Sequence, residues 1–104
     1  MMEKKIAVLR GDGIGPEVVN ESVKVLDQVA KKFNHQFHYT DVLLGGASID
    51  ATGVPLTDEA IETCKVSDAV LMGSIGGDTT TSPWYKLPPQ LRPEAGLLKI
   101  RKAL

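Results

Sequence analysis

The sequence predicts an α/β fold built on a mostly parallel sheet flanked by helices. Short apolar runs that are typical of buried strands alternate with amphipathic stretches at helical spacing. This alternation is typical of parallel sheets, in which all strands end at the same edge. Two glycine clusters, Gly11–Gly15 and Gly73–Gly77, each follow one of the apolar runs. Because ligands of such sheets gather at the carboxyl ends of the strands, both clusters are candidate parts of a binding site.

The first elements are a short strand, a long helix and a second strand. The apolar run 5–9 predicts the first strand, and the residues 37–44 predict the second. The helix is expected over 16–33, with Pro16 in its first turn and Asn34 at its end. Its apolar face is formed by Val19, Val23, Leu26, Ala30 and Phe33, and is widened by Val18, Val25 and Val29.

The second half continues the same alternation. The expectations, in chain order, are a loop over 45–55, a helix over 58–65, a strand over 68–74, a long loop over 75–96 and a helix that begins at 97. Thr57 is expected to cap the short helix. The strand over 68–74 is apolar on both faces, as central parallel strands are. Loops of this length in compact domains are usually functional or disordered. Trp84 and Tyr85 are expected to anchor this loop, and contact with a cofactor is the alternative.

Composition and charge exclude several classes of protein. The 104 residues are 42% hydrophobic and 24% charged, with a formal net charge of −1, so no nucleic-acid or membrane partner is expected. Cys64 is the only cysteine, is expected to be a small buried residue, and favours a reducing, cytoplasmic compartment. His35 and His38 have no carboxylate or cysteine at ligand spacing, which argues against a metal site.

The first glycine cluster does not match the common phosphate-binding motifs. A dinucleotide fingerprint needs G-x-G-x-x-G, but Pro16 stands where the third glycine belongs, and no P-loop motif occurs. The fingerprint of a Rossmann dinucleotide-binding fold is therefore missing. The cluster is either a tight turn or a turn beside a ligand at the helix N-terminus. Asp12 is expected to cap or brace this turn.

Four motifs occur in order: "AVLRGDGIGPEV", "GGASIDATGVPLTDEA", "DAVLMGSIGG" and "LRPEAGLLKIRK". Together they resemble the N-terminal part of the isocitrate/isopropylmalate dehydrogenase family of β-decarboxylating dehydrogenases, over residues 5–104. The segment Arg92–Lys102 points to the isopropylmalate-oxidising members. The resemblance implies that residues 1–104 are the N-terminal segment of the first, nucleotide-binding domain, and that the rest of the enzyme is absent from this chain. It also implies that this domain does not have the Rossmann fold, which agrees with the missing fingerprint.

The resemblance also implies an activity. The full-length, homodimeric enzyme would use NAD and Mg²⁺ or Mn²⁺ to convert (2R,3S)-3-isopropylmalate to 2-oxoisocaproate in leucine biosynthesis. The metal ligands and the catalytic residues would lie outside this chain, so the 104 residues are expected to be inactive alone. Two alternatives remain open: a related enzyme acting on tartrate, malate, homoisocitrate or isocitrate, and a non-catalytic fragment that associates with itself.

Residue roles follow from the resemblance. Ile14 would lie near the adenine, and Gly77, Asp78 and Thr79 would line the cofactor. Glu94 would lie at the nicotinamide ribose beside the substrate. Leu97 and Leu98 would contact the isopropyl group, and Arg101 would bind a substrate carboxylate. The last three share one face of a helix, since they are three and four residues apart. From the residues alone, an ordinary amphipathic helix with core leucines and a solvated Arg101 remains the alternative.

Overall fold

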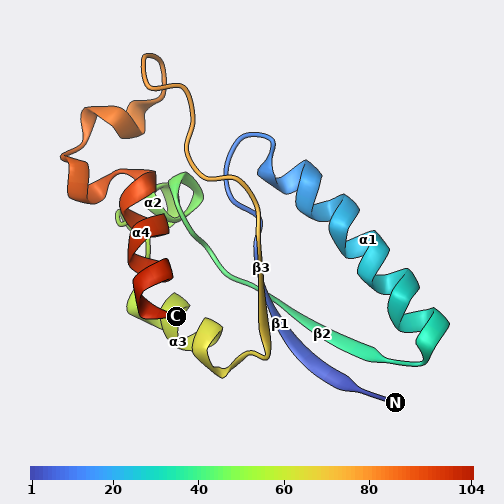
Figure 1. The fold of residues 1–104 in the computed structure, drawn as a ribbon. Helices are drawn as coiled ribbons and strands as arrows, with labels where there is room; N and C mark the ends of the chain where they lie inside the picture. The colour runs from blue at the N-terminus through green and yellow to red at the C-terminus, as the bar shows by residue number, and fades with distance from the viewer.

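The computed structural model describes all 104 residues and has a three-stranded parallel sheet with helices on both faces (Figure 1). The strands are β1 (Glu3–Leu9), β2 (Gln36–Asp41) and β3 (Ala69–Met72), in the spatial order β2-β1-β3. The predicted α/β class and the parallel sheet are therefore confirmed.

Strand β1 is the centre of the sheet. It pairs with β2 from Glu3 to Val8 and with β3 from Ile6 to Leu9. The sequence indicates a central position for β3, but among these 104 residues β3 lies at an edge of the sheet. Strand β3 pairs only with β1, and its four residues are exposed or half-buried. Strand β2 also ends earlier than predicted, at Asp41, although the amide of Val42 still donates to the carbonyl of Val8 at 2.9 Å.

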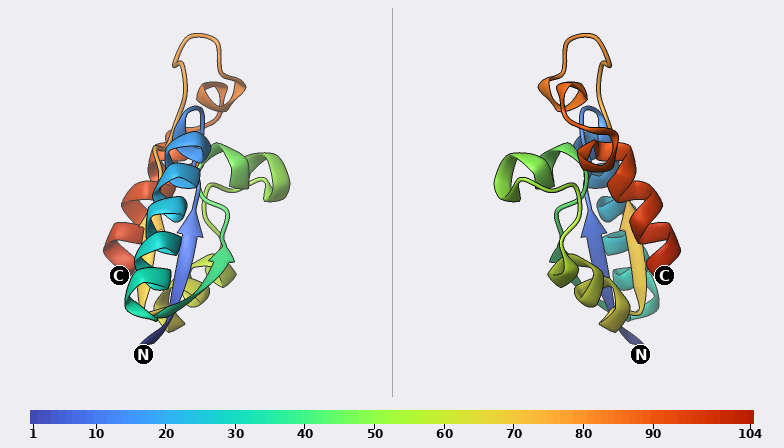
Figure 2. Two further views of the ribbon diagram at one scale, coloured as in Figure 1. Left: turned by 90° about the vertical axis from the view of Figure 1, so that its right-hand side faces the viewer. Right: turned by 90° about the vertical axis from the view of Figure 1, so that its left-hand side faces the viewer.

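Helix α1 (Gly15–Phe33) covers one face of the sheet (Figure 2). It has Pro16 in its first turn and ends at Asn34 in the left-handed conformation, as predicted. Val19 is buried against Ile6 and Val8, and further apolar side chains pack around them. The predicted width of the apolar face is wrong, because four of its members are exposed: Val18, Val25, Val29 and Phe33. A single helix on three strands contacts the sheet through a narrow stripe only.

The other face of the sheet carries α2 (Gly46–Thr52), α3 (Asp58–Val66) and α4 (Pro93–Ala103) (Figure 1). On this face Ala7 and Leu9 of β1 form one core with side chains from the helices and the segments between them. These include Leu44, Leu56, Ile61, Cys64 and Ile100. Cys64 is buried, as expected, and burial raises the pKa of its thiol. Because successive side chains of a strand point to opposite faces, β1 supplies both cores.

The helices of this face differ from the prediction in two places. A loop is predicted over 45–55, but α2 forms there, and the first amides of this helix are bound by the carboxylate of Asp12. Helix α4 begins at Pro93, four residues before the predicted start, since proline suits a first helical turn. Thr57 caps α3 as predicted, and its hydroxyl accepts from the amide of Ala60 at 3.1 Å.

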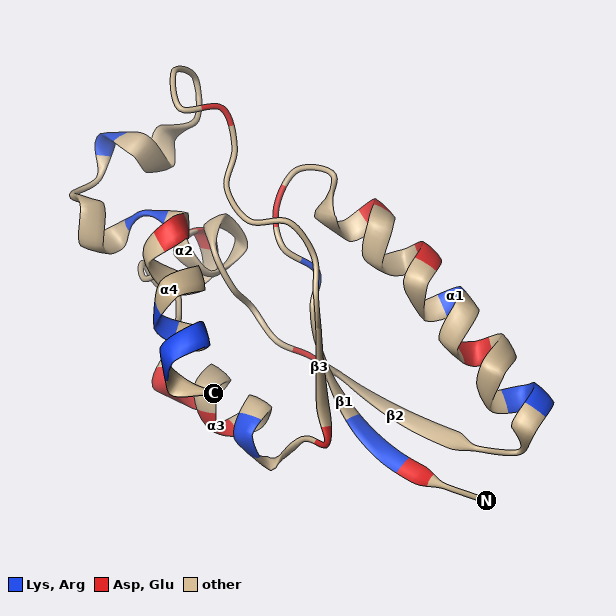
Figure 3. Cartoon of the chain, in the orientation of Figure 1, with Lys and Arg blue, Asp and Glu red and all other residues tan.

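The long loop after β3 extends beyond the carboxyl edge of the sheet and returns to α4 (Figure 1). It contains two 3₁₀ turns, Pro83–Lys86 and Pro89–Leu91. Acidic and basic residues are both distributed over the molecule, and α1 and α4 each have an acidic first turn and a basic last turn (Figure 3). None of the helices combines the length and the apolar composition that a membrane crossing requires.

Candidate functional site

The two glycine turns lie against each other at the carboxyl edge of the sheet. The amide of Asp12 donates to the carbonyl of Ser74 at 2.8 Å. Gly11 has a φ of +81°, and a Cβ there would lie 2.1 Å from the same carbonyl oxygen, so only glycine permits this approach. The expectation that both turns meet at one edge is confirmed.

Asp12 joins three segments at this edge. Its side chain is 5% exposed, and its carboxylate accepts from the amides of Gly46 (2.8 Å), Ala47 (2.9 Å) and Gly76 (2.9 Å). The sequence predicts that Asp12 braces its own turn. The structure instead connects it to the start of α2 and to the second turn. No local signal could identify these partners, because they lie 34 to 64 residues away in the chain.

Two neighbouring aromatic residues hold the long loop, as predicted. The indole nitrogen of Trp84 donates to Asp50 of α2 at 3.0 Å, and its ring lies directly over Gly46. The hydroxyl of Tyr85 donates to the carboxylate of Glu94 on α4 and accepts from the amide of Gly77 at 3.2 Å. The bond to Glu94, followed by desolvation, raises the pKa of Tyr85.

An open cavity of about 550 Å³ lies between the long loop and α4. Three of the predicted site residues meet in it: Thr79, Glu94 and Leu98. The remaining lining residues are Tyr85, Pro89, Arg92 and Ala95. The guanidinium of Arg92 donates to the carbonyl of Leu87 at 2.9 Å and so supports the loop. The cavity thus combines one carboxylate, one guanidinium, hydroxyl groups and apolar side chains.

Helix α4 presents the predicted substrate residues on one side. At 3.6 residues per turn, Glu94, Leu97, Leu98 and Arg101 fall within an arc of about 100°. Leu98 is 64% exposed, Leu97 is half-buried, and Arg101 is exposed without an ion-pair partner. The alternative in which both leucines belong to the core therefore does not describe Leu98. Leu97 and Arg101 lie outside the lining of the cavity.

The other predicted cofactor residues are more dispersed. Ile14 is 64% exposed at the start of α1 and does not line the cavity. Gly77 contributes its amide to Tyr85. Asp78 is exposed, and one of its carboxylate oxygens accepts from the amides of Thr80 (2.7 Å) and Thr81 (3.0 Å), which lowers the pKa of this carboxyl group.

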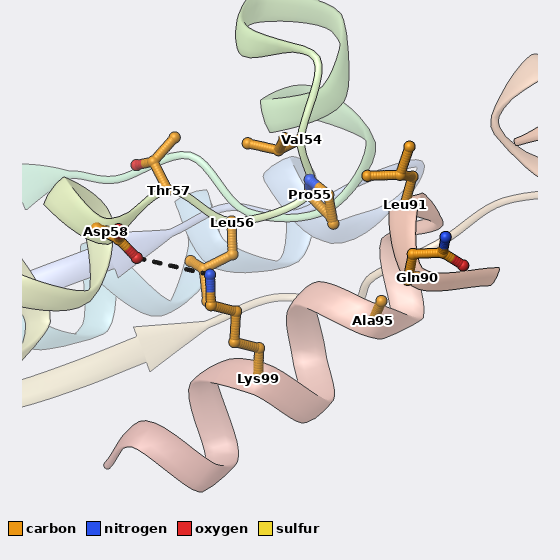
Figure 4. A pocket seen from close by; sticks show the side chains of 9 residues that line it. All are labelled: Val54, Pro55, Leu56, Thr57, Asp58, Gln90, Leu91, Ala95 and Lys99. Atoms are coloured by element: carbon orange, nitrogen blue, oxygen red, sulfur yellow. Dashed lines mark ion pairs between the residues drawn. The ribbon is translucent and has the colours of Figure 1, made fainter. Parts of the chain in front are cut away.

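A second open cavity, of about 410 Å³, lies next to the first and shares Ala95 of α4 with it (Figure 4). An ion pair between Lys99 and Asp58, with 3.6 Å between nitrogen and oxygen, crosses its wall. Its lining residues are Val54, Pro55, Leu56, Thr57, Asp58, Gln90, Leu91, Ala95 and Lys99. None of the predicted site residues belongs to it.

Comparison with known proteins decides the family. Residues 5–104 match the family model described as isocitrate/isopropylmalate dehydrogenase. The chain belongs to this family. It is 53% identical over 103 residues to the 3-isopropylmalate dehydrogenase of Oleidesulfovibrio alaskensis, a match that covers 99% of this chain and 28% of the relative. The enzyme of the same name from Aquifex aeolicus is 49% identical over 104 residues and is again covered to 28%.

A solved structure of the family has the same fold. The apo form of a β-decarboxylating dehydrogenase from Thermococcus kodakarensis matches with a TM-score of 0.74 and 31% identity, over 97% of this chain and 26% of that one. The chain thus spans about a quarter of the length of its relatives. The resemblance to this family that the four sequence motifs indicate is confirmed.

Proposed function

We propose that these residues are the N-terminal segment of the nucleotide-binding domain of an NAD-dependent 3-isopropylmalate dehydrogenase. The complete protein would be a cytoplasmic homodimer that acts in leucine biosynthesis and requires Mg²⁺ or Mn²⁺. The observation that carries the proposal is the exposed side of α4, where Glu94, Leu98 and Arg101 stand together. The family membership and the names of the relatives support it.

The chemistry of 3-isopropylmalate matches this side of α4. The substrate has two carboxylates, a hydroxyl group and one branched alkyl group. Arg101 is free to bind a carboxylate, and its planar guanidinium can do so through two hydrogen bonds. Leu98, with Leu97 one residue before it, offers an apolar surface to the isopropyl group. A helix that carries these groups on one side suits a substrate with separate apolar and anionic parts.

The residues also fit part of a nicotinamide cofactor. A carboxylate accepts hydrogen bonds from ribose hydroxyls, and Glu94 has one oxygen without a partner on the cavity. Thr79 adds a hydroxyl group to the same cavity, and Gly77 and Asp78 precede it on the loop. Ile14 would contact the adenine from the adjacent turn. When bound, the cofactor would accept the hydride from the substrate.

The residues do not fit a metal site. No group of three or more histidine, cysteine, aspartate or glutamate side chains lies close enough together to hold an ion. The ligands of the required Mg²⁺ or Mn²⁺ are therefore assigned to residues outside this segment.

Turnover assays on the protein expressed from its complete gene test the proposal. We expect NAD reduction with 3-isopropylmalate that is lost on chelation of divalent metal and restored by Mg²⁺ or Mn²⁺. Isocitrate, malate and tartrate are the competing substrates. A higher kcat/KM for any of these would assign the protein to a different member of the family, and absence of turnover with all four would overturn the proposal.

The 104 residues alone are expected to be inactive, because they lack the metal ligands. The purified chain should reduce no NAD in the presence of 3-isopropylmalate and Mn²⁺, under conditions in which the complete protein turns over. Reduction above the buffer rate would place the catalytic residues inside this segment and contradict the assignment.

A further inference from the structure

We propose that Tyr85 is a positioning residue, whose hydroxyl group fixes the carboxylate of Glu94 in one orientation on the cavity wall. Its kinetic consequence rests on the proposed function. The hydrogen-bonding role itself does not, and a separate measurement tests it.

The position of Glu94 explains why it needs such a partner. It is an exposed residue in the first turn of α4, and its side chain has several rotamers available. It forms no ion pair, and its one hydrogen-bonded partner is the hydroxyl of Tyr85. Arg92, the cation on the same cavity, is turned to the carbonyl of Leu87 instead. Without Tyr85, nothing in this chain would select one orientation of the carboxylate.

Tyr85 is itself held from the backbone of the second glycine turn. Its hydroxyl accepts from the amide of Gly77, which leaves its proton directed to Glu94. Gly76 has a φ of +102°, and a Cβ there would lie 2.6 Å from Oε1 of Glu94 and 2.8 Å from the hydroxyl of Tyr85. The absence of a side chain at Gly76 therefore makes room for the pair.

The same turn is fixed by the sheet edge. The buried carboxylate of Asp12 accepts from the amide of Gly76 at 2.9 Å, next to the amide that binds Tyr85. A continuous series of bonds thus runs from the edge of the sheet through the turn and Tyr85 to Glu94. A carboxylate held in this way needs no reordering when a ligand binds, and such preorganisation increases the rate. The hydroxyl of Tyr85 is protonated at neutral pH, as for any tyrosine, and the bond to Glu94 raises its pKa further.

A double-mutant cycle in the complete protein tests the kinetic role. We expect Tyr85→Phe to lower kcat/KM for 3-isopropylmalate about tenfold, because one charge-assisted hydrogen bond is lost. In a Glu94→Gln background the same substitution should change kcat/KM less than about twofold, since Tyr85 acts through Glu94. An equal loss in both backgrounds, or no loss in the wild type, would overturn the proposal.

Tyr39→Phe is the matched control. The hydroxyl of Tyr39 also donates to a carboxylate, that of Asp27 at 3.1 Å, but on the α1 face of the sheet, away from the cavity. The substitution Tyr39→Phe removes the same chemical group as Tyr85→Phe and should leave kcat/KM unchanged. A loss equal to that of Tyr85→Phe would indicate a general effect of losing a tyrosine hydroxyl and would overturn the positioning role.

Titration of the tyrosine rings by ¹³C NMR tests the hydrogen bond without turnover. The Tyr85 signal, identified by its loss in Tyr85→Phe, should titrate above the ordinary tyrosine pKa and fall toward it in Glu94→Gln. An unchanged pKa would refute the bond. If the pKa falls but no hydroxy acid is oxidised, the proposed function fails while the positioning of Glu94 stands.

Discussion

The two glycine turns differ in the backbone amides that their aspartates bind. In each turn an aspartate accepts hydrogen bonds from backbone amides. Asp12 binds amides from two other segments and is buried, whereas Asp78 binds the amides of Thr80 and Thr81 and is exposed. Asp12 therefore joins distant segments, whereas Asp78 closes only the part of the loop that directly follows the second turn.

This difference predicts that the first turn contributes mainly to folding stability and the second mainly to ligand binding. The first turn is enclosed by the second turn and by α2, and its conformation depends on long-range bonds. The loop that follows the second turn supplies Thr79 and Tyr85 to the cavity and is held by two aromatic residues, Trp84 and Tyr85. We expect substitutions at the first turn to reduce folding stability, and substitutions on the cavity side of the second turn to affect the activity.

Replacing Asp12 has the largest expected effect. Asp12→Ala leaves one buried and two partly buried amides without an acceptor and should lower the free energy of unfolding by about 3 kcal/mol. Asp12→Asn keeps one acceptor oxygen and should cost about half as much. Urea denaturation of the complete protein measures both. Asp78→Asn is the matched control, and a loss equal to that of Asp12→Asn would show that the two turns do not differ as described.

The Trp84–Asp50 bond has a smaller expected effect. Trp84→Phe and Asp50→Ala each remove the 3.0 Å hydrogen bond between the long loop and α2, and each should cost about 1 kcal/mol. Because both changes remove the same bond, the double variant should cost less than the sum of the single variants. Amide hydrogen exchange over 77–92 should quicken in all three. Additive losses, with unchanged exchange in the loop, would mean that the bond does not hold the loop.

The smallest effect is expected at Tyr39 and appears only at high pH. Burial and the bond to Asp27 raise the pKa of Tyr39 to about 12, so the protonated form is favoured in the folded state. This contribution is present below pH 10 and is lost as the pH rises through about 12. Tyr39→Phe should therefore flatten the decline in stability between pH 10 and 12, as followed by thermal melting. An unaltered decline in the variant would refute the raised pKa.

The sequence predicts well the features that depend on neighbouring residues. The strand–helix order, the end of α1 at Asn34 and the cap at Thr57 follow from local propensity and capping, and the structure confirms them. The position of Leu97, Leu98 and Arg101 on one side of α4 also follows from their spacing alone. Helix α2 is missed because its first amides are satisfied by Asp12, a residue 34 positions earlier in the chain.

Features that depend on distant residues are predicted poorly. The central place of β1 is set by pairing on both of its sides, which its own residues do not reveal. The bonds of Asp12 and of Tyr85 to Glu94 need the two turns and α4 to be in place first. The roles of Ile14, Gly77, Asp78, Thr79, Glu94, Leu97, Leu98 and Arg101 remain predictions from the family resemblance.

Kinetic comparison of two substrates tests most directly whether the exposed side of α4 meets the substrate. In the complete protein, Leu98→Ala should lower kcat/KM for 3-isopropylmalate about 10- to 100-fold more than for malate, because only the first has an isopropyl group. Arg101→Lys should lower kcat/KM for both substrates by similar factors. Leu91→Ala, which lies on the second cavity, should change kcat/KM for neither substrate. Equal losses for both substrates in Leu98→Ala, or the same shift in Leu91→Ala, would contradict the placement of this side of α4 against the substrate.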